Sequence, residues 1–335
     1  MSRAAVFGTG TWGTAFALVL ADAGTDVAMW GRRRELCEAI NRSGRNTDYL
    51  PDIELPRSVR ATPDPAEAAS GADLVVLAVP SQTLRENLTA WRAVLPADAV
   101  LVSLMKGIEL GTAKRMSEVI AEVAGVGDER VAVLSGPNLA GEIALRQPAA
   151  SVVASVDESV AQRIQHACHS AYFRPYTNTD VVGTELGGAV KNVIALAVGM
   201  AEGVGFGDNT RASVITRGLA ETARLGAALG ADPYTFSGLA GLGDLVATCS
   251  SPLSRNRTFG EKLGRGLSVS EIVGSTRQVA EGVKSCESVL DLARRVGVDV
   301  PIVEHVTYVV AGKMTPMEML RSLISRAAKP ERHGY

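Results

Sequence analysis

The stretch "RAAVFGTGTWGTAFALVLADAG", residues 3–24, decides the fold of this chain. It opens with a short apolar run of strand length, and from residue 11 its apolar positions show helical spacing that ends at a glycine. Gly8, Gly10 and Gly13 lie between the two patterns in the spacing GxGxxG. A strand that passes through a glycine turn directly into a helix predicts the start of a doubly wound α/β domain.

Each glycine has its own physical task in such a turn. The first permits the tight turn, the second lets the backbone approach a pyrophosphate at the positive helix N-terminus, and the third lets helix and strand pack closely. The motif alone is weak evidence, because glycines also occur in ordinary turns. Its position between a strand and a helix, with a second strand pattern at residues 26–31, predicts a bound dinucleotide.

The rest of the first half repeats short apolar runs between helix-like segments. The runs lie at residues 72–80, 99–107, 130–138 and 149–155. Because they are apolar throughout, they suit strands buried on both faces of a parallel sheet covered by helices. Residues 1–179 are therefore predicted to form a Rossmann-like, NAD(P)-binding domain with a doubly wound, mostly parallel sheet.

After about Thr177 the sequence becomes helical, with helical spacing over residues 181–204, 211–230 and 279–297. Since 335 residues exceed what one hydrophobic core usually serves, two domains are expected. The second, residues 180–335, is predicted to be all-helical.

Two helix starts carry capping signals. Asp64 is placed to cap a short helix that begins at Pro65, and Glu67 is placed to complete a capping box. Residues 315–318, "TPME", form a second capping box with proline at the first helical position.

The composition limits the function classes. The net charge is −2 and residues 32–34 are the longest basic run, which argues against a nucleic-acid surface.

The N-terminus has no basic region or cleavage site, so no signal peptide is expected. The weakly charged residues 186–201 are interrupted by Lys191 and Asn192 and are interpreted as a buried helix, not a membrane span. Four widely spaced cysteines without a CxxC pair indicate reduced thiols and a cytoplasmic protein.

The sequence "VAMWGRRREL", residues 27–36, departs from the pattern of an NAD-specific site. Such a site has Asp or Glu after the second strand, whereas this chain has Gly31, Arg32 and Arg33. A carboxylate repels a 2′-phosphate, and guanidinium groups bind it. The pattern therefore favours NADPH and leaves NADH open, with a merely solvated helix start as the alternative interpretation.

Lys191 is the only charged residue between Glu185 and Glu202. A lysine in such a helix is either held in a site, where desolvation or a nearby cation lowers its pKa, or extended to the surface; spacing alone leaves both open. Lys106 and the sequence "SGPN", residues 135–138, follow predicted strands at their carboxyl ends, where ligands bind in open α/β sheets.

The stretch "GLAGLGDLVATCSSPLSRNRTFG", residues 238–260, combines a glycine run that frees the backbone with Asp244 at its end. Ser254, Arg255 and Asn256 then bring a hydroxyl, a guanidinium and an amide together, groups suited to a phosphate. The alternative interpretation is a long connection without a ligand. The sequence "HACH", residues 166–169, lacks a further ligand pair nearby, so no metal is predicted.

Together these stretches resemble one family over nearly the whole length: the bacterial-type NAD(P)-dependent sn-glycerol-3-phosphate dehydrogenases. The resemblance rests on "GTGTWGTA", "SLMKGIE", "SGPNLAGEIA", "ELGGAVKNVIALAVGMAEGVGFGDNTRA", residues 238–260 and "VAEGVKS". It implies reversible reduction of dihydroxyacetone phosphate to sn-glycerol 3-phosphate, which supplies the glycerophospholipid backbone of lipid metabolism. It also implies a second domain that binds substrate and carries the catalytic residues.

By motif match, the resemblance implies that Lys191 is the general acid/base. Implied substrate contacts are Lys106, Gly136, Asn138, Lys191, Asp244, Ser254, Arg255 and Asn256. Implied cofactor contacts, with Gly8, Gly10 and Gly13, are Thr11, Trp12, Arg32, Arg33, Lys106, Ala140, Arg255, Val279 and Glu281. The family often has Ser or Thr where this chain has Asn138, so that contact departs from the pattern.

Two other functions are weighed against this one. A ketopantoate or β-hydroxyacid reductase joins similar domains but acts on a carboxylate substrate, whereas the "SRN" sequence favours a phosphate. A non-catalytic NADPH sensor requires neither Lys191 nor Asp244. The expected partners are a small-molecule substrate and, because the helical domain is apolar, a second copy of the chain; no nucleic acid and no integral membrane segment are expected.

Overall fold

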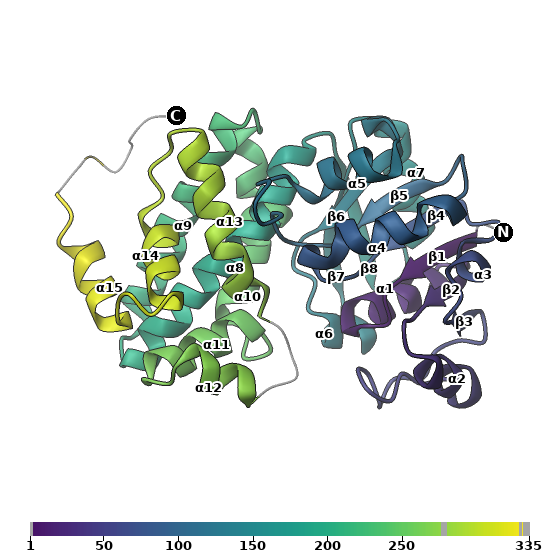
Figure 1. Cartoon of the computed structure of the whole chain (residues 1–335), viewed down its shortest axis with the longest axis horizontal. Coiled ribbons are helices and arrows are strands. Elements are labelled where there is room, and N and C mark those ends of the chain that lie inside the picture. Colours follow the sequence, from purple (N-terminus) through teal and green to yellow (C-terminus); the bar gives the residue numbers. More distant parts are fainter. Residues whose placement is uncertain (1–2, 276–279, 328–329, 331–335) are drawn as a thin grey trace. The chain divides into compact units, whose positions relative to one another are not determined.

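The computed structural model describes residues 3–275, 280–327 and 330. Contacts between residues divide the chain into two compact units. Unit 1 comprises Met1–Met105 and Met116–Val181, and unit 2 comprises Lys106–Arg115 and Val182–Tyr335. Figure 1 labels the elements of both units.

Unit 1 is built on an eight-stranded sheet in the order β3-β2-β1-β4-β5-β6-β7-β8. Neighbouring strands from β1 to β6 pair in parallel, so the predicted doubly wound, mostly parallel sheet is confirmed. The strands are β1 (Arg3–Phe7), β2 (Asp26–Trp30), β3 (Val59–Thr62), β4 (Leu74–Leu77), β5 (Val100–Ser103), β6 (Val131–Ser135), β7 (Ala149–Ala154) and β8 (Phe173–Asn178). The helices are α1 (Thr11–Asp22), α2 (Arg34–Ser43), α3 (Pro65–Ala69), α4 (Leu84–Trp91), α5 (Met116–Ala124), α6 (Ala140–Ala144) and α7 (Glu158–Cys168), with 3₁₀ turns at Ser81–Thr83, Arg92–Val94 and Asp128–Arg130.

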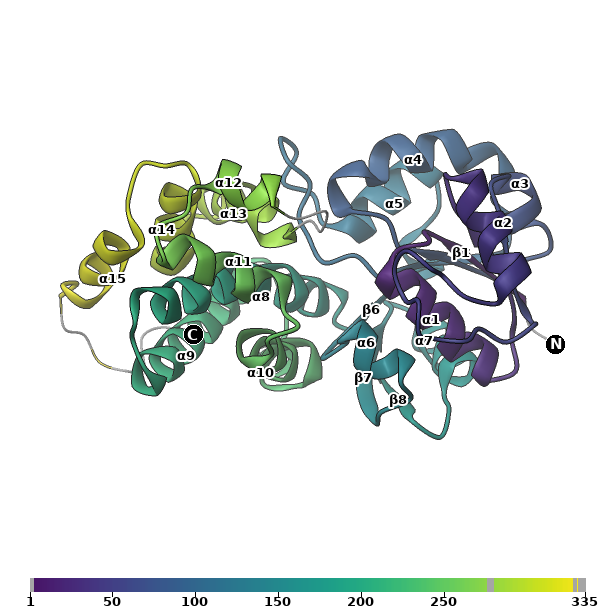
Figure 2. The same cartoon turned by 90° about the horizontal axis from the view of Figure 1, so that it is seen from below.

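The sheet separates two hydrophobic cores. Along β1, Ala4 and Val6 face one core, and Ala5 and Phe7 face the other, as the two-residue period of a strand requires. The first core includes residues of α1, α2, α6 and α7, and the second includes residues of α3, α4 and α5. Figure 2 shows α1, α6 and α7 on one side of the sheet and α4 and α5 on the other. The carboxyl ends of β1 to β6 consequently share one edge, which is where such folds bind ligands.

The far end of the sheet differs from the sequence-based prediction. The run at residues 149–155 was interpreted as another strand of a parallel sheet, but β7 pairs antiparallel with β6. The connection between them contains only the five-residue helix α6. A helix of five residues is only about 7.5 Å long, roughly half the length of a five-residue strand, so it does not carry the chain back to the start of a parallel partner.

Two strands of unit 1 were not predicted, and one helix was expected only under the alternative interpretation of the arginine run. The strands β3 and β8 lie at the sheet edges; β3 has four residues, and β8 alternates buried and exposed side chains around Pro175. The helix α2 begins within the arginine run and buries only Leu36, Cys37 and Ile40. Short or half-exposed elements lack the continuous apolar pattern on which the prediction relied.

The capping predictions are partly confirmed. Asp64 caps α3, and its side chain accepts a hydrogen bond from Ala66 N at 2.9 Å. Glu67 does not complete a capping box, because its carboxylate accepts from the hydroxyl of Thr62 at 2.5 Å instead. At Thr315 the predicted capping box is present in full.

Outside the segment 106–115, the regular elements that the structure describes in unit 2 are helices. Its helices are α8 (Val181–Val204), α9 (Asp208–Ala228), α10 (Asp244–Ser250), α11 (Arg255–Gly264), α12 (Val269–Gly274), α13 (Glu281–Arg295), α14 (Pro301–Val310) and α15 (Pro316–Ile324), with a 3₁₀ segment at Pro233–Ser237 and a π-helical segment at Leu239–Gly243. Helix α8 is long and apolar enough to cross a membrane, but 94% of its most apolar window is buried inside the protein. The prediction of a buried core helix is confirmed.

Glycines let α8 and α11 pack with their backbones in contact. A Cβ on Gly199 would lie 2.0 Å from the carbonyl oxygen of Arg257, and one on Gly203 would lie 2.2 Å from that of Glu261. From the other side, a Cβ on Gly260 would lie 2.2 Å from the carbonyl oxygen of Leu196. The glycines on both helices therefore allow the two backbones to cross in contact, and a larger side chain at these positions would push the helices apart.

A buried carboxylate joins α9 to α14. Both oxygens of Glu221 accept from Ile302 N, at 2.8 and 3.1 Å, at the start of α14. Burial raises the pKa of Glu221 to about 7, although the hydrogen bonds from the backbone of α14 oppose that shift. Because the folded-state pKa lies above the unfolded value, the contribution of Glu221 to stability is complete below about pH 4.5 and is lost as the pH rises through 7.

We expect the free energy of unfolding to fall by up to roughly 3 kcal/mol between pH 5 and 8 through this one group. The variant Glu221→Gln keeps an acceptor for the helix but does not titrate, so its stability should lack that component. Denaturant titrations at both pH values measure the difference, with Glu287→Gln, an exposed carboxylate on α13, as the control. Equal pH dependence in the native protein and in Glu221→Gln would contradict the prediction.

Candidate active site

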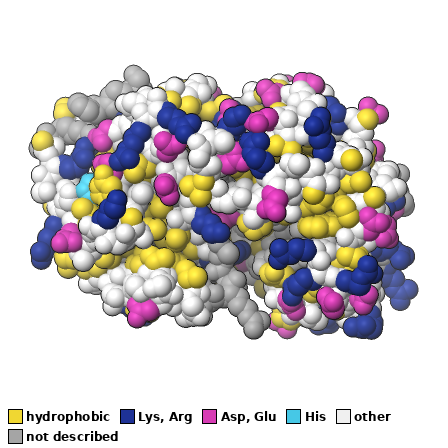
Figure 3. Space-filling view, viewed as in Figure 1, with side chains coloured by type: hydrophobic (Ala, Val, Ile, Leu, Met, Phe, Trp, Pro, Cys, Tyr) yellow, Lys and Arg dark blue, Asp and Glu magenta, His cyan; other side chains and the backbone are white. Residues whose placement is uncertain are grey.

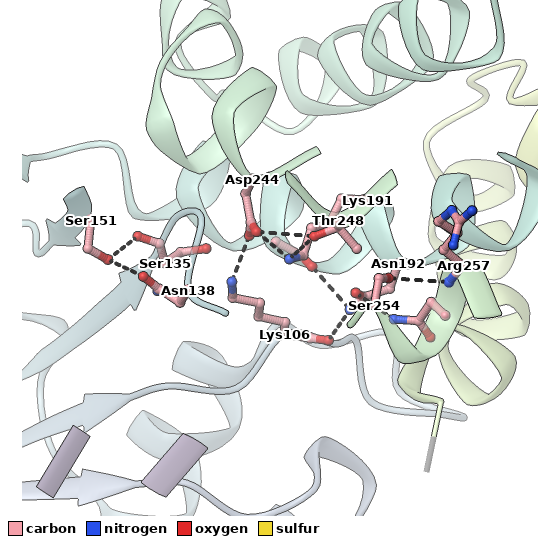
Figure 4. A network of polar contacts seen from close by, with 12 residues as sticks. Lys106, Ser135, Asn138, Ser151, Lys191, Asn192, Asp244, Thr248, Ser254 and Arg257 are labelled. Carbon is pink, nitrogen blue, oxygen red and sulfur yellow. Dashed lines mark hydrogen bonds and ion pairs between the residues drawn. The ribbon is translucent and has the colours of Figure 1, made fainter. Parts of the chain in front are cut away.

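Two lysines share one buried carboxylate in unit 2. Lys191 on α8 donates to Asp244 Oδ1, and Lys106 Nζ lies 2.6 Å from Asp244 Oδ2. Asp244, the first residue of α10, is 1% exposed, and Lys191 is 7% exposed. Figure 4 shows Asp244 between the two ammonium groups. The three charges sum to a net positive charge in a buried place, which suits an anionic ligand.

This environment lowers the pKa of Lys191 to about 8. Burial is the largest cause, because it penalises the charged form. The carboxylate of Asp244 opposes the shift, and the positive charge of Lys106 adds to it. The sequence left two interpretations of Lys191 open. This geometry supports the one in which the lysine is held in a buried site, not the one in which it extends to the surface. A lysine with a pKa near the working pH is suited to proton transfer.

Two neighbours of Lys191 were missed by the sequence analysis. Thr248 Oγ1 accepts from Lys191 Nζ at 2.7 Å, and Asn192 Nδ2 donates to the carbonyl oxygen of Lys106 at 3.3 Å. Thr248 follows Asp244 by one helical turn, so the two side chains lie on one face of α10. That spacing is the signal that could have found Thr248. Asn192 was noticed only as a polar interruption of an apolar helix.

The segment that carries Lys106 is held by unit 2. It lies within the range predicted for the first domain, but its contacts group Lys106–Arg115 with the helical unit. Arg295 at the end of α13 donates to the carbonyl oxygens of Gly111 at 2.9 Å and Thr112 at 2.7 Å. These bonds fix the segment whose first residue is paired with Asp244.

The glycine-rich stretch around Asp244 is not a loop. It forms the π-helical segment Leu239–Gly243 and continues into α10, so the expectation that its glycines free the backbone is wrong. A Cβ on Gly241 would lie 2.1 Å from the carbonyl oxygen of Phe236, and one on Gly187 would lie 2.4 Å from that of Ala240. These glycines serve close packing, which places Asp244 against α8.

The three residues of the "SRN" sequence have different surroundings. Ser254 caps α11, with its hydroxyl accepting from Arg257 N at 3.3 Å (Figure 4). The amide of Asn256 donates to Asn192 Oδ1 and accepts from Gly282 N, both at 2.9 Å, so it joins α8, α11 and α13. Arg255 is exposed.

The predicted glycine loop follows β1 in unit 1. Gly8 has a φ of +137°, and a Cβ on Gly8 would lie 2.4 Å from the carbonyl oxygen of Ala78. A Cβ on Gly13 would lie 2.2 Å from the carbonyl oxygen of Gly8, whereas one on Gly10 meets nothing within 4 Å. The first and third positions therefore require glycine for packing, and the space beside the second is open.

The start of α1 has further features that fit a dinucleotide. Gly10 is its N-cap and has no side chain, so no side-chain hydrogen bond caps the first backbone N–H groups of the helix. Thr11 and Trp12 are the first helical residues, and Trp12 Nε1 is buried without a hydrogen-bond partner among the described residues. A group that brings an anion and acceptor atoms would satisfy these donors, so the residues fit NAD(P).

The predicted arginines follow β2. Arg32 is exposed, and Arg33 is the N-cap residue of α2. Arg33 Nη1 lies 2.7 Å from Asp48 Oδ2, and its guanidinium lies 6.0 Å from the ring centroid of Tyr49. The hydrogen bond to Asp48 raises the pKa of Arg33. Asp48 lies beyond the next helix, α2, so no local pattern in the sequence connects it with Arg33.

The loop after β6 contains the other predicted residues of unit 1. Gly136 has a φ of +130°, and Ala140 is the first residue of α6. Asn138 Oδ1 accepts from the hydroxyl of Ser151 at 3.1 Å (Figure 4). The other atom of that amide, Nδ2, is buried and makes no hydrogen bond within the part of the chain that the structure describes. The hydroxyl of Ser151 has one proton and also donates to the carbonyl oxygen of Ser135, at 2.7 Å, so rotating the amide of Asn138 by 180° lets Nδ2 donate to Ser151 Oγ instead.

Of the remaining predicted cofactor residues, Glu281 is the first residue of α13, and Val279 lies outside the described residues. Cys249, beside Asp244 on α10, is fully buried, and burial raises the pKa of its thiol to about 12, which makes it unreactive. Across residues 3–275, 280–327 and 330, no group of three or more His, Cys, Asp or Glu could hold a metal ion. His166 instead contacts the carbonyl oxygen of Gln162.

The surface charges are mixed. On the face of the described residues drawn in Figure 3, basic and acidic side chains are interspersed over both units. Such a surface has no extended basic stripe on that face, in agreement with the net charge of −2.

Comparison with known proteins covers almost the whole chain. The family described as "NAD-dependent glycerol-3-phosphate dehydrogenase N-terminus" matches residues 3–161, and "NAD-dependent glycerol-3-phosphate dehydrogenase C-terminus" matches residues 180–321. A protein from Streptomyces griseus subsp. griseus named glycerol-3-phosphate dehydrogenase (NAD(P)+) is 69% identical over 330 residues, which are 98% of each chain.

Comparison with solved structures also finds glycerol-3-phosphate dehydrogenases. Glycerol-3-phosphate dehydrogenase from Coxiella burnetii superimposes with a TM-score of 0.92 at 35% identity, covering 97% of this chain and 99% of that one. A ketopantoate reductase of the PanE/ApbA family from Ralstonia eutropha superimposes with a TM-score of 0.60 at 17% identity, covering 96% of this chain and 100% of that one. At that identity the second comparison shows a shared fold alone.

Proposed function

Because the chain belongs to the family of NAD-dependent glycerol-3-phosphate dehydrogenases, we propose that it catalyses the reversible reduction of dihydroxyacetone phosphate to sn-glycerol 3-phosphate. It is an oxidoreductase that acts on a CH–OH group with NAD(P). The observation that carries the proposal is the buried Lys191, paired with Asp244 beside Lys106.

Lys191 acts as the general acid/base. As an ammonium it donates a proton to the oxygen of the substrate ketone while negative charge develops there, and it stabilises that charge. In the reverse direction the neutral amine accepts the proton of the alcohol. Asp244 and Thr248 accept hydrogen bonds from Nζ and so fix the direction in which the ammonium points.

The phosphate of the substrate is bound by positive charge. Arg255 is exposed at the start of α11 and is free of the packing that holds Ser254 and Asn256. Lys106 adds the second positive charge beside Asp244. Asn256 positions the start of α11 against α8, and therefore Arg255 relative to Lys191. Holding the phosphate away from the reacting carbon orients the ketone.

The cofactor is held by the glycine loop and its flanking residues. When bound, the nicotinamide supplies the hydride. Gly8, Gly10 and Gly13 form the cradle at the start of α1, and Trp12 Nε1 offers a buried donor. Arg32 and Arg33 follow β2, and their guanidinium groups suit a 2′-phosphate, which favours NADPH over NADH.

We expect the two directions of the reaction to depend on pH in opposite ways. Reduction needs protonated Lys191, so its kcat/KM should fall as the pH rises through about 8. Oxidation of glycerol 3-phosphate needs the neutral amine and should rise through the same pH. Initial rates in both directions between pH 6.5 and 9.5 measure this, and two flat profiles would exclude Lys191 as the titrating group.

The test of the proposed function is the initial rate of dihydroxyacetone phosphate reduction, followed by nicotinamide absorbance with NADPH and NADH in parallel. Turnover supports the enzyme, and a clear preference for NADPH supports the role of Arg32 and Arg33. Absence of turnover with both cofactors would contradict the substrate. Ketopantoate and β-hydroxyacids are the rival substrates, and ligand-dependent partner binding without turnover is the result that a sensor predicts.

The assembly and the location of the protein are also proposed. A homodimer is proposed because the helical second half of the chain is apolar. The four cysteines are buried and free, which agrees with a cytoplasmic location. The predicted boundary between residues 1–179 and 180–335 stays a prediction.

A further inference from the structure

The glycine after β2 occupies the position where an NAD-specific site has a carboxylate. A Cβ on Gly31 would lie 2.7 Å from Thr9 Cγ2 and 2.9 Å from Cys37 Sγ. Neither neighbour is the far end of a long side chain, so neither moves away easily. The absence of an acidic residue here therefore has a steric cause as well as an electrostatic one.

A carboxylate reaches the same region from another part of the chain. Asp48 lies in the turn after α2, and its Oδ2 is 2.7 Å from Arg33 Nη1. Both side chains of this pair are about half exposed, at 48% for Arg33 and 45% for Asp48. An ion pair that is so exposed contributes little to stability and opens at small cost, so both groups are available to a ligand.

The turn that carries Asp48 is attached to the glycine loop. Asn46 is fully buried, and its Nδ2 donates to the carbonyl oxygen of Thr9 at 2.9 Å and to Thr14 Oγ1 at 2.8 Å. Backbone bonds from Tyr49 N and Leu50 N to the carbonyl oxygen of Asn46, at 3.3 and 2.8 Å, close the turn. Asp48 is thus held at a fixed place relative to the loop that binds the dinucleotide.

We propose that Asp48 is a specificity-determining residue that accepts a hydrogen bond from the ribose 2′-hydroxyl of NAD(H) and opposes the 2′-phosphate that Arg33 attracts. The inference rests on the proposed function, since it assumes that unit 1 binds a nicotinamide dinucleotide. In this arrangement the Arg33–Asp48 pair presents one donor and one acceptor to the 2′ position. The pair allows one site to bind both NAD(H) and NADP(H), and Asp48 reduces the preference for NADP(H) that Arg33 provides.

The test is calorimetric binding of NADP+ and NAD+, which differ only in the 2′-phosphate, without substrate. In Asp48→Asn the repulsion of the phosphate is removed and the acceptor for the hydroxyl is weakened. The ratio of the Kd for NAD+ to the Kd for NADP+ is therefore expected to rise about tenfold. The matched control is Glu54→Gln, which breaks the exposed Arg45–Glu54 pair near the same turn and should leave the ratio unchanged.

A ratio in Asp48→Asn within about twofold of the native ratio would overturn the proposal, because the ion pair would then be a surface contact only. A ratio that shifts toward NAD+ would overturn it as well, since Asp48 would then orient Arg33 for the phosphate. Dihydroxyacetone phosphate reduction by the native protein separates the two proposals. If the ratio shifts but no substrate turns over, the proposed function fails and the role of Asp48 stands.

Discussion

Replacing Lys191 by methionine is expected to lower kcat for dihydroxyacetone phosphate reduction about 1000-fold, the range that a positioned general acid supplies. Methionine fills a similar volume on α8 but brings no proton and no charge. Asp244 keeps Lys106 as its counter-charge at 2.6 Å, so the buried carboxylate is not left alone and the variant should fold. Steady-state kinetics measures the loss.

Two further measurements test whether the loss of kcat in Lys191→Met comes from the proton-transfer step and not from weaker cofactor binding or a general effect of removing a lysine. NADP+ affinity of Lys191→Met should stay within about twofold of the native value, because the glycine loop lies in unit 1. Lys284→Met, which removes an exposed lysine from α13, should retain the native kcat. Equal and mild losses of kcat and cofactor affinity in Lys191→Met would remove the lysine from its catalytic role.

The second large effect is expected at Gly260, where α11 crosses α8. Alanine places a Cβ 2.2 Å from the carbonyl oxygen of Leu196, so the two helices have to separate. We expect Gly260→Ala to lower the free energy of unfolding by about 3 kcal/mol, even though alanine is the better helix former. The melting temperature should then fall by roughly 10 °C.

The same substitution elsewhere provides the control. A Cβ on Gly274 at the end of α12 meets nothing within 4 Å, so Gly274→Ala should be neutral or slightly stabilising. Since Asn256 and Arg255 begin the helix that Gly260 packs, Gly260→Ala should also raise the KM for dihydroxyacetone phosphate. Unchanged melting of Gly260→Ala would show that the crossing tolerates a methyl group, which is the outcome against this interpretation.

The fold was predictable where local patterns are strong. The glycine turn between β1 and α1 and the apolar runs of β4, β5 and β6 carry their own signals, because a strand buried on both faces is apolar throughout. The edge strands β3 and β8 were missed, since an edge strand is short or half exposed and lacks that pattern. The direction of β7 depends on how short the helix before it is, and the apolar run of the strand itself does not express that length.

For the site residues, the resemblance named more positions than the sequence patterns did, and those positions stay predictions. Lys191 stood out in the sequence as a lone charge, but spacing alone left its role open. The contacts of Asn192, Thr248 and Asp48 were not predicted, because each depends on a partner brought to it by folding. The glycines near Asp244 were expected to free the backbone, whereas they are helical and pack closely against their neighbours.

The sequence by itself determined the strand–turn–helix that binds a dinucleotide, the helical second half and the membership of the family. These depend on residues close together in the chain, where backbone geometry and the period of apolar positions act directly. Only the tertiary structure decided that Lys106 and Lys191 share Asp244, and that Asp48 reaches Arg33. Such pairs join residues from different elements, so their distances, and the pKa of about 8 at Lys191, follow from how the helices and strands pack.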